Sequence, residues 1–201
     1  MVAINDYEAG NIRSVEKAIA SLGYEAAVTR DADTILTADH VILPGVGAFG
    51  DAMDKLSSYG LVDVIRTVSC REIPFLGICL GFQLMFENSE EAPGVEGLGL
   101  LKGSILRIPE KDDLKIPHIG WNSLQYPSRG RLFAGVPEGA YVYFVHSYYL
   151  QAQEAGGVKA TTEYGVEIHA SVEKDNLFAC QFHPEKSSDV GMKILQNFME
   201  I

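Results

Sequence analysis

The chain has 201 residues, of which 47% are hydrophobic, with a formal net charge of -11 and a pI near 4.8. This length and apolar content suffice for one substantial core, so we expect a single domain over residues 1–201. The acidic balance and the lack of any Lys or Arg run argue against nucleic acid and anionic membranes as partners, because long-range electrostatics would repel both.

Strand and helix patterns alternate through the first 88 residues. Apolar runs predict strands at residues 2–5, 24–28, 40–43 and 73–78, and helical periodicity predicts helices at 12–22, 51–71 and 80–86. Gly23 is expected to cap the first helix, and the second helix is expected to break near Tyr59-Gly60. Such alternation is typical of a parallel sheet with helices on both faces.

From about Leu98 onward the pattern changes to strands. They are predicted at residues 103–108, 118–126, 141–150, 158–163, 166–172 and 176–182, and a last helix is predicted around Val190, Ile194, Leu195 and Phe198. Turn residues separate the last two strands, so we expect an antiparallel extension of the sheet. The predicted fold class is therefore α/β, three-layered and flavodoxin-like, with a mostly parallel central sheet and an antiparallel extension.

Three cysteines, Cys70, Cys79 and Cys180, match neither a disulfide framework nor a CxxC metal site. A reducing cytoplasm fits these thiols best. The N-terminus has no basic segment of an export signal, and no stretch has the apolar length of a membrane span. We therefore expect a soluble, cytoplasmic protein.

The turn Gly77-Ile78-Cys79-Leu80-Gly81, between an apolar strand and a helix, has the pattern of a nucleophile elbow. Gly77 and Gly81 are expected because such a turn leaves no room for a Cβ at either flank. The positive end of the following helix dipole favours the thiolate form of Cys79. Cys79 is therefore the predicted nucleophile, whereas the other two cysteines lack this context and are interpreted as core or near-core residues.

The segment His183-Pro184-Glu185 offers a base and a group to orient it. Alternate residues of an extended chain point to one side, so the Glu185 carboxylate can reach one imidazole nitrogen while the other faces the thiol. The remaining histidines lack such a partner and are interpreted as strand or loop residues: His40, His118, His146 and His169. The predicted triad is Cys79, His183 and Glu185.

Hydrolysis through a thioester also needs backbone N–H groups that point at the developing oxyanion. The N–H of Leu80, directly after the nucleophile, is one candidate. The others are Val46 and Gly47 in the loop Pro44-Gly45-Val46-Gly47, which follows a predicted parallel strand. Taken alone, this loop could equally be an ordinary glycine turn.

Together, residues 44–47, 77–83 and 183–185 resemble, in order and approximate spacing, the triad (class I) glutamine amidotransferases. The resemblance implies the fold of that family and a glutaminase that forms a γ-glutamyl thioester on Cys79, releases ammonia and then admits water to release glutamate. It implies no cofactor and no metal. It also implies that L-glutamine is held by Gln83, Glu91, His146, Ser147 and Tyr148, although the last three could equally be sheet residues.

Residues 6–15, 117–122 and 183–188 narrow the resemblance, nearly end to end, to the glutaminase subunits of imidazole glycerol phosphate synthases. Glu8-Ala9 fits that pattern least. The resemblance implies a heterodimer with a (β/α)8-barrel cyclase subunit, which receives the ammonia and makes imidazole glycerol phosphate and an aminoimidazole carboxamide ribonucleotide for histidine biosynthesis. It implies a docking face around the ammonia exit that contains Asn11, Arg13, Trp121 and Asn122. Trp121 could instead be a core anchor.

Three other functions remain open at this point. The glutaminase could serve another acceptor, as in anthranilate or aminodeoxychorismate synthesis, although residues 10–14 and 119–122 speak against it. The chain could be a stand-alone cysteine hydrolase or peptidase, which Glu185 and Gln83 disfavour. It could also be a non-catalytic binding subunit, because intact residues do not prove an assembled site.

Overall fold

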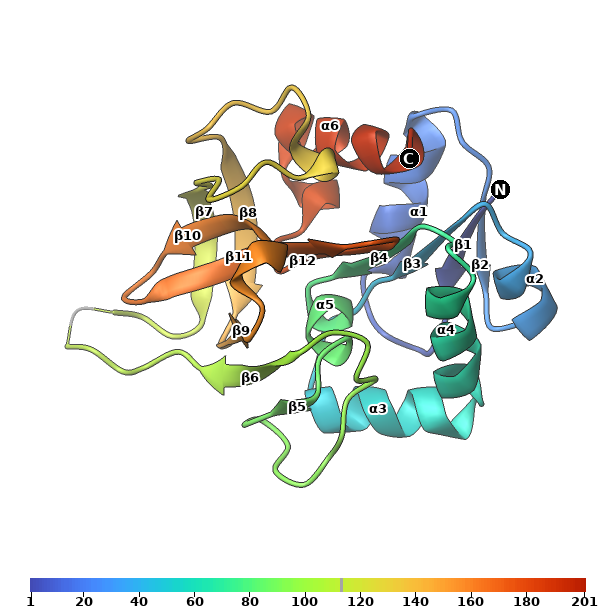
Figure 1. Ribbon diagram of the computed structural model, residues 1–201, viewed down its shortest axis with the longest axis horizontal. Coiled ribbons are helices and arrows are strands. Elements are labelled where there is room, and N and C mark those ends of the chain that lie inside the picture. The colour runs from blue at the N-terminus through green and yellow to red at the C-terminus, as the bar shows by residue number, and fades with distance from the viewer. Residues whose placement is uncertain (113) are drawn as a thin grey trace.

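The computed structural model describes residues 1–112 and 114–201, and in this part of the chain the centre is a seven-stranded sheet of order β10-β11-β12-β4-β3-β1-β2 (Figure 1). Its parallel part consists of β12 (Leu177–Cys180), β4 (Phe75–Ile78), β3 (His40–Leu43), β1 (Val2–Asn5) and β2 (Ala26–Thr29). Antiparallel strands β11 (Glu167–Lys174) and β10 (Val158–Glu163) continue it. The predicted fold class is confirmed.

Helices cover both faces of this sheet (Figure 1). One face carries α1 (Ile12–Ser21) and α6 (Ser188–Met199), and the other carries α2 (Ala32–Leu36), α3 (Phe49–Ser58), α4 (Leu61–Cys70) and α5 (Leu80–Leu84). Alternate strand residues serve alternate faces: Phe75 of β4 packs in the cluster under α3 to α5, whereas Leu76 and Ile78 pack with α1 and α6. Two apolar layers therefore enclose the sheet, as a three-layer fold requires.

The predicted break near Tyr59-Gly60 is confirmed, because α3 ends at Ser58 and α4 begins at Leu61. Gly60 has φ 68°, a left-handed conformation that glycine adopts without steric cost. The short α2, whose N-cap Asp31 accepts a hydrogen bond from the Thr34 N–H, was not predicted. One turn of helix carries too few residues for its apolar periodicity to show.

Five strands of the described residues form two small sheets beside the central one, and this corrects the predicted layout. Strands β5 (Asn88–Ser89), β6 (Gly103–Arg107) and β9 (Tyr148–Ala152) form one sheet, and β7 (His118–Ser123) pairs with β8 (Tyr141–His146) in the other. The single strand predicted at 141–150 is therefore wrong. At Ser147 the chain passes from one small sheet to the other, while apolar and aromatic residues continue through the corner and hide it from the sequence pattern.

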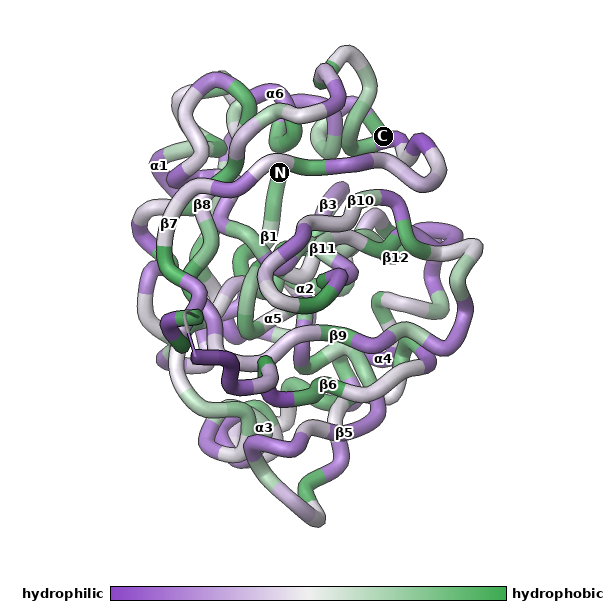
Figure 2. The backbone as a smooth tube through the Cα atoms, turned by 90° about the vertical axis from the view of Figure 1, so that its left-hand side faces the viewer, coloured by the Kyte–Doolittle hydropathy of each residue, from purple (hydrophilic) through white to green (hydrophobic). Residues whose placement is uncertain are grey.

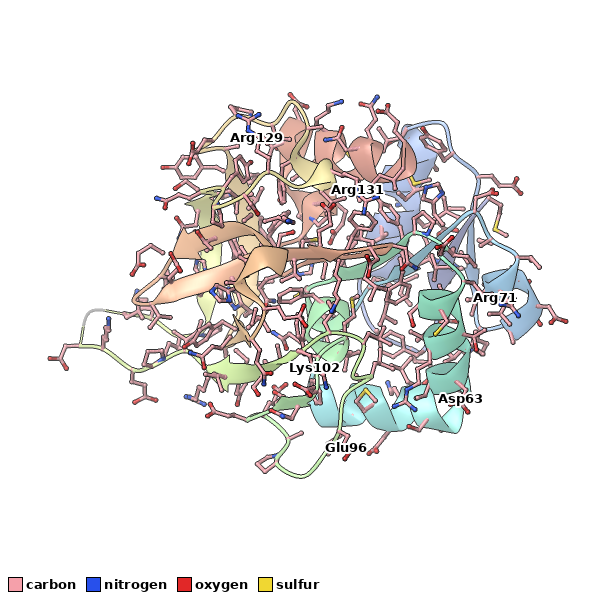
Figure 3. All side chains as sticks on the ribbon, in the orientation of Figure 1. Asp63, Arg71, Glu96, Lys102, Arg129 and Arg131 are labelled. Atoms are coloured by element: carbon pink, nitrogen blue, oxygen red, sulfur yellow. The ribbon has the colours of Figure 1, made fainter. Side chains whose placement is uncertain are left out.

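Hydrophobic stretches follow the interior strands, for example β1, and hydrophilic stretches follow many of the outer loops (Figure 2). Two surface ion pairs involve Arg131 and Lys102, which are labelled in Figure 3 and lie 2.7 Å from Glu173 and Glu87, respectively. Such half-exposed pairs contribute at most about 1 kcal/mol each. In the residues that the structure covers, no helix combines the length and the apolarity needed to cross a bilayer. The expectation of a single domain stays a prediction.

Candidate active site

Cys79 stands in the turn between β4 and α5 with φ 55° and ψ -106°, a strained backbone conformation that costs on the order of 1–3 kcal/mol. The flanking glycines explain how the turn is packed. A Cβ on Gly81 would lie 1.8 Å from the Leu43 carbonyl oxygen, and one on Gly77 would lie 2.5 Å from the Met85 sulfur. The prediction that neither flank has room for a Cβ is confirmed.

The Cys79 thiol is buried and has two polar neighbours. The Val145 carbonyl oxygen lies 3.9 Å from Sγ and can accept a hydrogen bond from the thiol. The Gln181 side-chain nitrogen donates toward Sγ at 3.8 Å. Helix α5 ends at Leu84, two residues earlier than predicted, so few peptide dipoles are aligned behind the thiol. Local hydrogen bonds therefore matter more for this thiol than the helix dipole does.

His183 and Glu185 follow β12, the strand that runs parallel to β4, so both lie at the same sheet edge as Cys79. The His183 Nδ1 atom is 2.7 Å from Glu185 Oε1. The Asn11 side-chain amide donates to the same carboxylate oxygen and lies 3.4 Å from His183 Nδ1. His183 Nε2 is buried and has no hydrogen-bond partner among the described residues, which leaves it available for proton exchange.

Burial by itself would lower the pKa of His183, but the neighbouring Cys79 sulfur and Glu185 carboxylate outweigh it and raise the pKa to about 9. The fold therefore favours the imidazolium form of His183. Such a group can donate a proton to a leaving amine at neutral pH.

A cavity of about 260 Å³ opens beside the Cys79 thiol. This volume suits a small metabolite rather than a drug-sized ligand. The predicted oxyanion and glutamine-binding residues all line it together with Cys79: Val46, Gly47, Leu80, Gln83, Glu91, His146, Ser147 and Tyr148. Pro117 and Val145 complete the lining, and of these two Pro117 was not predicted.

Two of the residues expected to bind glutamine already have partners in the protein. Gln83 donates through Nε2 to the Tyr148 carbonyl oxygen at 3.1 Å and to Gln181 Oε1 at 2.9 Å. Glu91 accepts a hydrogen bond from the Phe49 N–H at 2.8 Å, at the start of α3. Their side chains are therefore held in place on the cavity wall before any substrate binds.

The loop Pro44–Gly47 also lines the cavity, through Val46 and Gly47, and its first half is tethered. The Tyr7 hydroxyl donates to the Pro44 carbonyl oxygen at 2.7 Å, and a Cβ on Gly45 would lie 2.1 Å from that hydroxyl. Burial, and to a smaller degree Cys79, raise the pKa of Tyr7, which keeps its hydroxyl protonated. The Leu80 N–H, a predicted oxyanion donor, instead donates to the Gly45 carbonyl oxygen at 3.2 Å.

A pair of buried histidines supports the corner between β8 and β9. His146 Nδ1 is 2.8 Å from the Tyr148 carbonyl oxygen, which can only accept, so Nδ1 carries the proton and Nε2 is an acceptor. His118 Nδ1, 3.1 Å from that Nε2, must then be the donor. Burial lowers the pKa of His146 to about 3 and that of His118 to about 4, so both rings are neutral at pH 7.

The four residues predicted at a docking face differ in their exposure and in their contacts. Trp121 on β7 is 51% exposed, so the alternative that it anchors the core is wrong. Asn122 donates to the Glu163 carbonyl oxygen, and the exposed Arg13 pairs with Glu16. Asn11 turns toward Glu185 rather than toward the solvent.

Two residues at the site, Tyr7 and Gln181, were missed from the sequence. Gln181 interrupts the apolar run from Leu177 to Phe182, and a lone polar residue inside a buried strand was the available signal. Tyr7 follows the carboxyl end of β1, the sheet edge at which ligands bind in parallel α/β folds. Among the described residues, no group of three or more His, Cys, Asp and Glu side chains is arranged to hold a metal ion.

Comparison with known proteins adds three findings. Residues 3–201 match the sequence profile of the family described as "Glutamine amidotransferase class-I". The chain is 52% identical over 200 residues to "Imidazole glycerol phosphate synthase subunit HisH" of Moorella thermoacetica, and the match covers 100% of this chain and 94% of the relative. It is 50% identical to the protein of that name from Caldanaerobacter subterraneus subsp. tengcongensis, with 100% of this chain and 98% of the relative covered. A structure titled "Crystal structure of glutamine amidotransferase" superposes with a TM-score of 0.77 at 20% identity, covering 99% of this chain and 97% of the other, which supports the fold alone.

Proposed function

The chain belongs to the class-I glutamine amidotransferase family, and from this premise we propose that it is the glutaminase subunit of an imidazole glycerol phosphate synthase. It hydrolyses glutamine to glutamate and ammonia and serves histidine biosynthesis. The observation that carries the chemistry is the Cys79 thiol on the wall of a cavity of about 260 Å³, with His183 and Glu185 at the same sheet edge.

In the first half of the reaction, the Cys79 sulfur attacks the side-chain amide carbon of glutamine and the C–N bond breaks. His183 donates its proton to the departing nitrogen, so that ammonia leaves and a γ-glutamyl thioester remains. The Glu185 carboxylate, 2.7 Å from Nδ1, holds the ring with Nε2 free to exchange this proton. In the second half, neutral His183 takes a proton from water, the hydroxide displaces the thiolate, and glutamate is released.

The oxyanion formed in both halves requires backbone donors, and we assign them to Leu80 and to Val46 or Gly47. The Leu80 N–H is engaged by the Gly45 carbonyl oxygen at 3.2 Å in this structure. A change in the Pro44–Gly47 loop must free it before it can stabilise a tetrahedral intermediate. This requirement supports a glutaminase that is slow alone and faster when a partner with its ligand resets the loop.

For the partner we propose a (β/α)8-barrel cyclase subunit that receives the ammonia in a heterodimer. The β7–β8 sheet offers a surface for it, because three large hydrophobic side chains are exposed there: Ile119 at 60%, Trp121 at 51% and Tyr141 at 58%. Exposed aromatic side chains of this kind are typical of interface hot spots. The free thiols at all three cysteines support a reducing compartment, and we place the reaction in the cytoplasm.

The test of the activity is ammonia release from glutamine, with and without the barrel subunit and its nucleotide ligand, by wild type, Cys79→Ala and Cys70→Ala. We expect Cys79→Ala to lose at least about a thousandfold in kcat, because the nucleophile is gone, and the exposed Cys70→Ala to keep full activity. Glutamine-dependent product formation by Cys79→Ala at the wild-type rate would refute the mechanism. Cleavage of peptides by the isolated chain would favour a stand-alone hydrolase instead.

The docking surface is tested by measuring the dissociation constant of the complex with the barrel subunit. Trp121→Ala is expected to weaken binding by about 2 kcal/mol, as for a typical aromatic hot spot. Ile201→Ala is the matched control, because Ile201 is also an exposed large hydrophobic residue but lies outside the β7–β8 sheet. Equal binding of Trp121→Ala and wild type would place the partner on another surface.

A further inference from the structure

Gln181 is a fully buried polar residue that the triad does not use. It follows β12 directly, and its N–H donates to the Ala170 carbonyl oxygen at 2.9 Å, which fixes its backbone. The register of β12 on β4 pairs Cys180 with Ile78, so Gln181 and Cys79 leave the sheet as neighbours. The Cys79 N–H donates to the Cys180 carbonyl oxygen at 2.9 Å across the same step.

The orientation of the Gln181 amide follows from its neighbours. Because the Tyr148 carbonyl can only accept, the Gln83 atom 3.1 Å from it must be the amide nitrogen. The same nitrogen lies 2.9 Å from Gln181, so the Gln181 atom facing it must be the oxygen. The Gln181 nitrogen is then directed at the Cys79 sulfur, 3.8 Å away.

We propose that Gln181 is a positioning residue for the nucleophile, and that its amide N–H stabilises the Cys79 thiolate. The Val145 carbonyl oxygen, 3.9 Å from Sγ, can accept from the thiol but only repels the thiolate. Gln181 supplies the donor that the anion needs, and Gln83 aligns Gln181 from the far side. Gln83 also donates to the carbonyl oxygen of Tyr148, which lines the cavity. The two amide side chains therefore connect Cys79 to the cavity wall by hydrogen bonds.

This inference rests on the proposed function for its meaning, but its test does not need glutamine. In a Cys70→Ser background, which removes the exposed cysteine, Cys79 is alkylated with iodoacetamide between pH 6 and pH 10 and the product is located by mass spectrometry. In Gln181→Met, which fills similar volume without a donor, we expect alkylation to be about tenfold slower at pH 7, because hydrogen bonds to charged groups are the stronger ones. At pH 10 we expect rates within about twofold of each other, because alkaline pH favours the thiolate form whether or not a donor is present.

The pH profile separates positioning from mere packing. A distorted site would slow alkylation by the same factor at every pH, and that result, or equal rates at pH 7, would overturn the proposal. Asn197→Leu is the matched control, since this buried amide on α6 donates to the Leu132 and Ala134 carbonyl oxygens at 2.8 Å each and, in the described part of the chain, makes no hydrogen bond to Cys79 or Gln181. It should leave the alkylation rate unchanged.

If Gln181→Met does not fold, Gln181→Glu carries the test, because it keeps the side-chain shape and replaces the donor with an acceptor. With the barrel subunit present, both variants are expected to lower kcat for glutamine at least about tenfold while KM stays within about threefold. If wild type lacks glutaminase activity but Gln181→Met is alkylated more slowly than wild type at pH 7, the proposed function is refuted and this inference stands. If wild type is an active glutaminase but Gln181→Met and wild type are alkylated equally fast, the inference about Gln181 is refuted and the proposed function stands.

Discussion

The turn around Cys79 and the loop Pro44–Gly47 are two glycine-rich segments that follow neighbouring parallel strands, β4 and β3, yet they are held very differently. Around Cys79, a Cβ on either flanking glycine would collide with a neighbouring atom. In the loop, only Gly45 is enclosed, whereas a Cβ on Gly47 would meet no atom within 4 Å and Val46 is 38% exposed. The fold therefore encloses the turn around Cys79 much more tightly than the second half of the loop.

This difference divides the chemistry between fold and partner. The nucleophile, its base and the cavity wall are held by buried contacts. The Leu80 N–H, one of the oxyanion donors proposed above, is engaged by the Gly45 carbonyl oxygen. Under the proposed mechanism, a partner therefore needs to change only the Pro44–Gly47 loop to raise activity, which is a small rearrangement for a large gain in transition-state stabilisation.

The largest expected effect follows from exchanging glycine for alanine in each segment. Gly81→Ala should lower the free energy of unfolding by more than about 5 kcal/mol or prevent folding, because its Cβ would lie 1.8 Å from the Leu43 carbonyl oxygen. Gly47→Ala should cost only about 1–2 kcal/mol, from the strain of a side chain at φ 121°. Urea unfolding measures both.

Gly156→Ala serves as the control, because Gly156 has neither a positive φ nor an atom within 4 Å of the added Cβ. It should stay within about 0.5 kcal/mol of wild type. A comparable loss for Gly81→Ala and Gly47→Ala would contradict the contrast between a packed turn and an open loop.

The Cys79 turn could be predicted from sequence because its cause is local. Gly77 and Gly81 flank the nucleophile directly, and a strand before and a helix after them define the elbow. The parallel sheet could also be predicted, because short apolar runs that mark its strands alternate with segments of helical periodicity. Local periodicity also placed the break between α3 and α4.

The features that sequence could not predict depend on contacts between distant residues. The corner at Ser147 exists because β8 pairs with β7 and β9 pairs with β6, a choice that no run of residues expresses. The tethers of the loop by Tyr7, and of the thiol by Gln181, join residues 37 and 102 positions apart. The contact of Asn11 with Glu185, 174 positions apart, could not be predicted for the same reason.

The next effect concerns the corner of the cavity that His146 and His118 support. The pKa of His146 is lowered from 6.5 to about 3, by burial first and also by the neighbouring His118 and His183 side chains, so the folded protein keeps its ring neutral. As pH falls below 6.5, the unfolded chain takes up a proton that the folded chain refuses. Stability is therefore full above pH 6.5 and declines toward pH 3, by at most roughly 5 kcal/mol for this pKa shift at about 1.36 kcal/mol per unit.

Urea unfolding from pH 7 to pH 4 measures this decline, and His146→Asn isolates it from the titration of carboxylates. Asparagine can donate to the Tyr148 carbonyl oxygen in place of Nδ1 but does not titrate. We expect the free energy of unfolding of the variant to fall less than that of wild type over this range, by up to about 1.36 kcal/mol per pH unit. Identical pH dependence would mean that His146 is protonated as readily in the folded chain as in the unfolded one.

The smallest effect tests how the tethered half of the loop is held. Tyr7→Phe removes the hydrogen bond to the Pro44 carbonyl oxygen without changing the ring, and a buried acceptor is left unpaired. We expect a loss of about 1–2 kcal/mol in the free energy of unfolding and faster hydrogen exchange at the Leu80 N–H, whose acceptor is Gly45. Tyr126→Phe is the matched control, because its hydroxyl also faces a proline carbonyl, that of Pro137, but at 3.4 Å and in an exposed position. If both variants lose equally little and exchange at Leu80 is unchanged, the enclosure of Gly45 alone, rather than the Tyr7 hydroxyl, keeps this half of the loop in place.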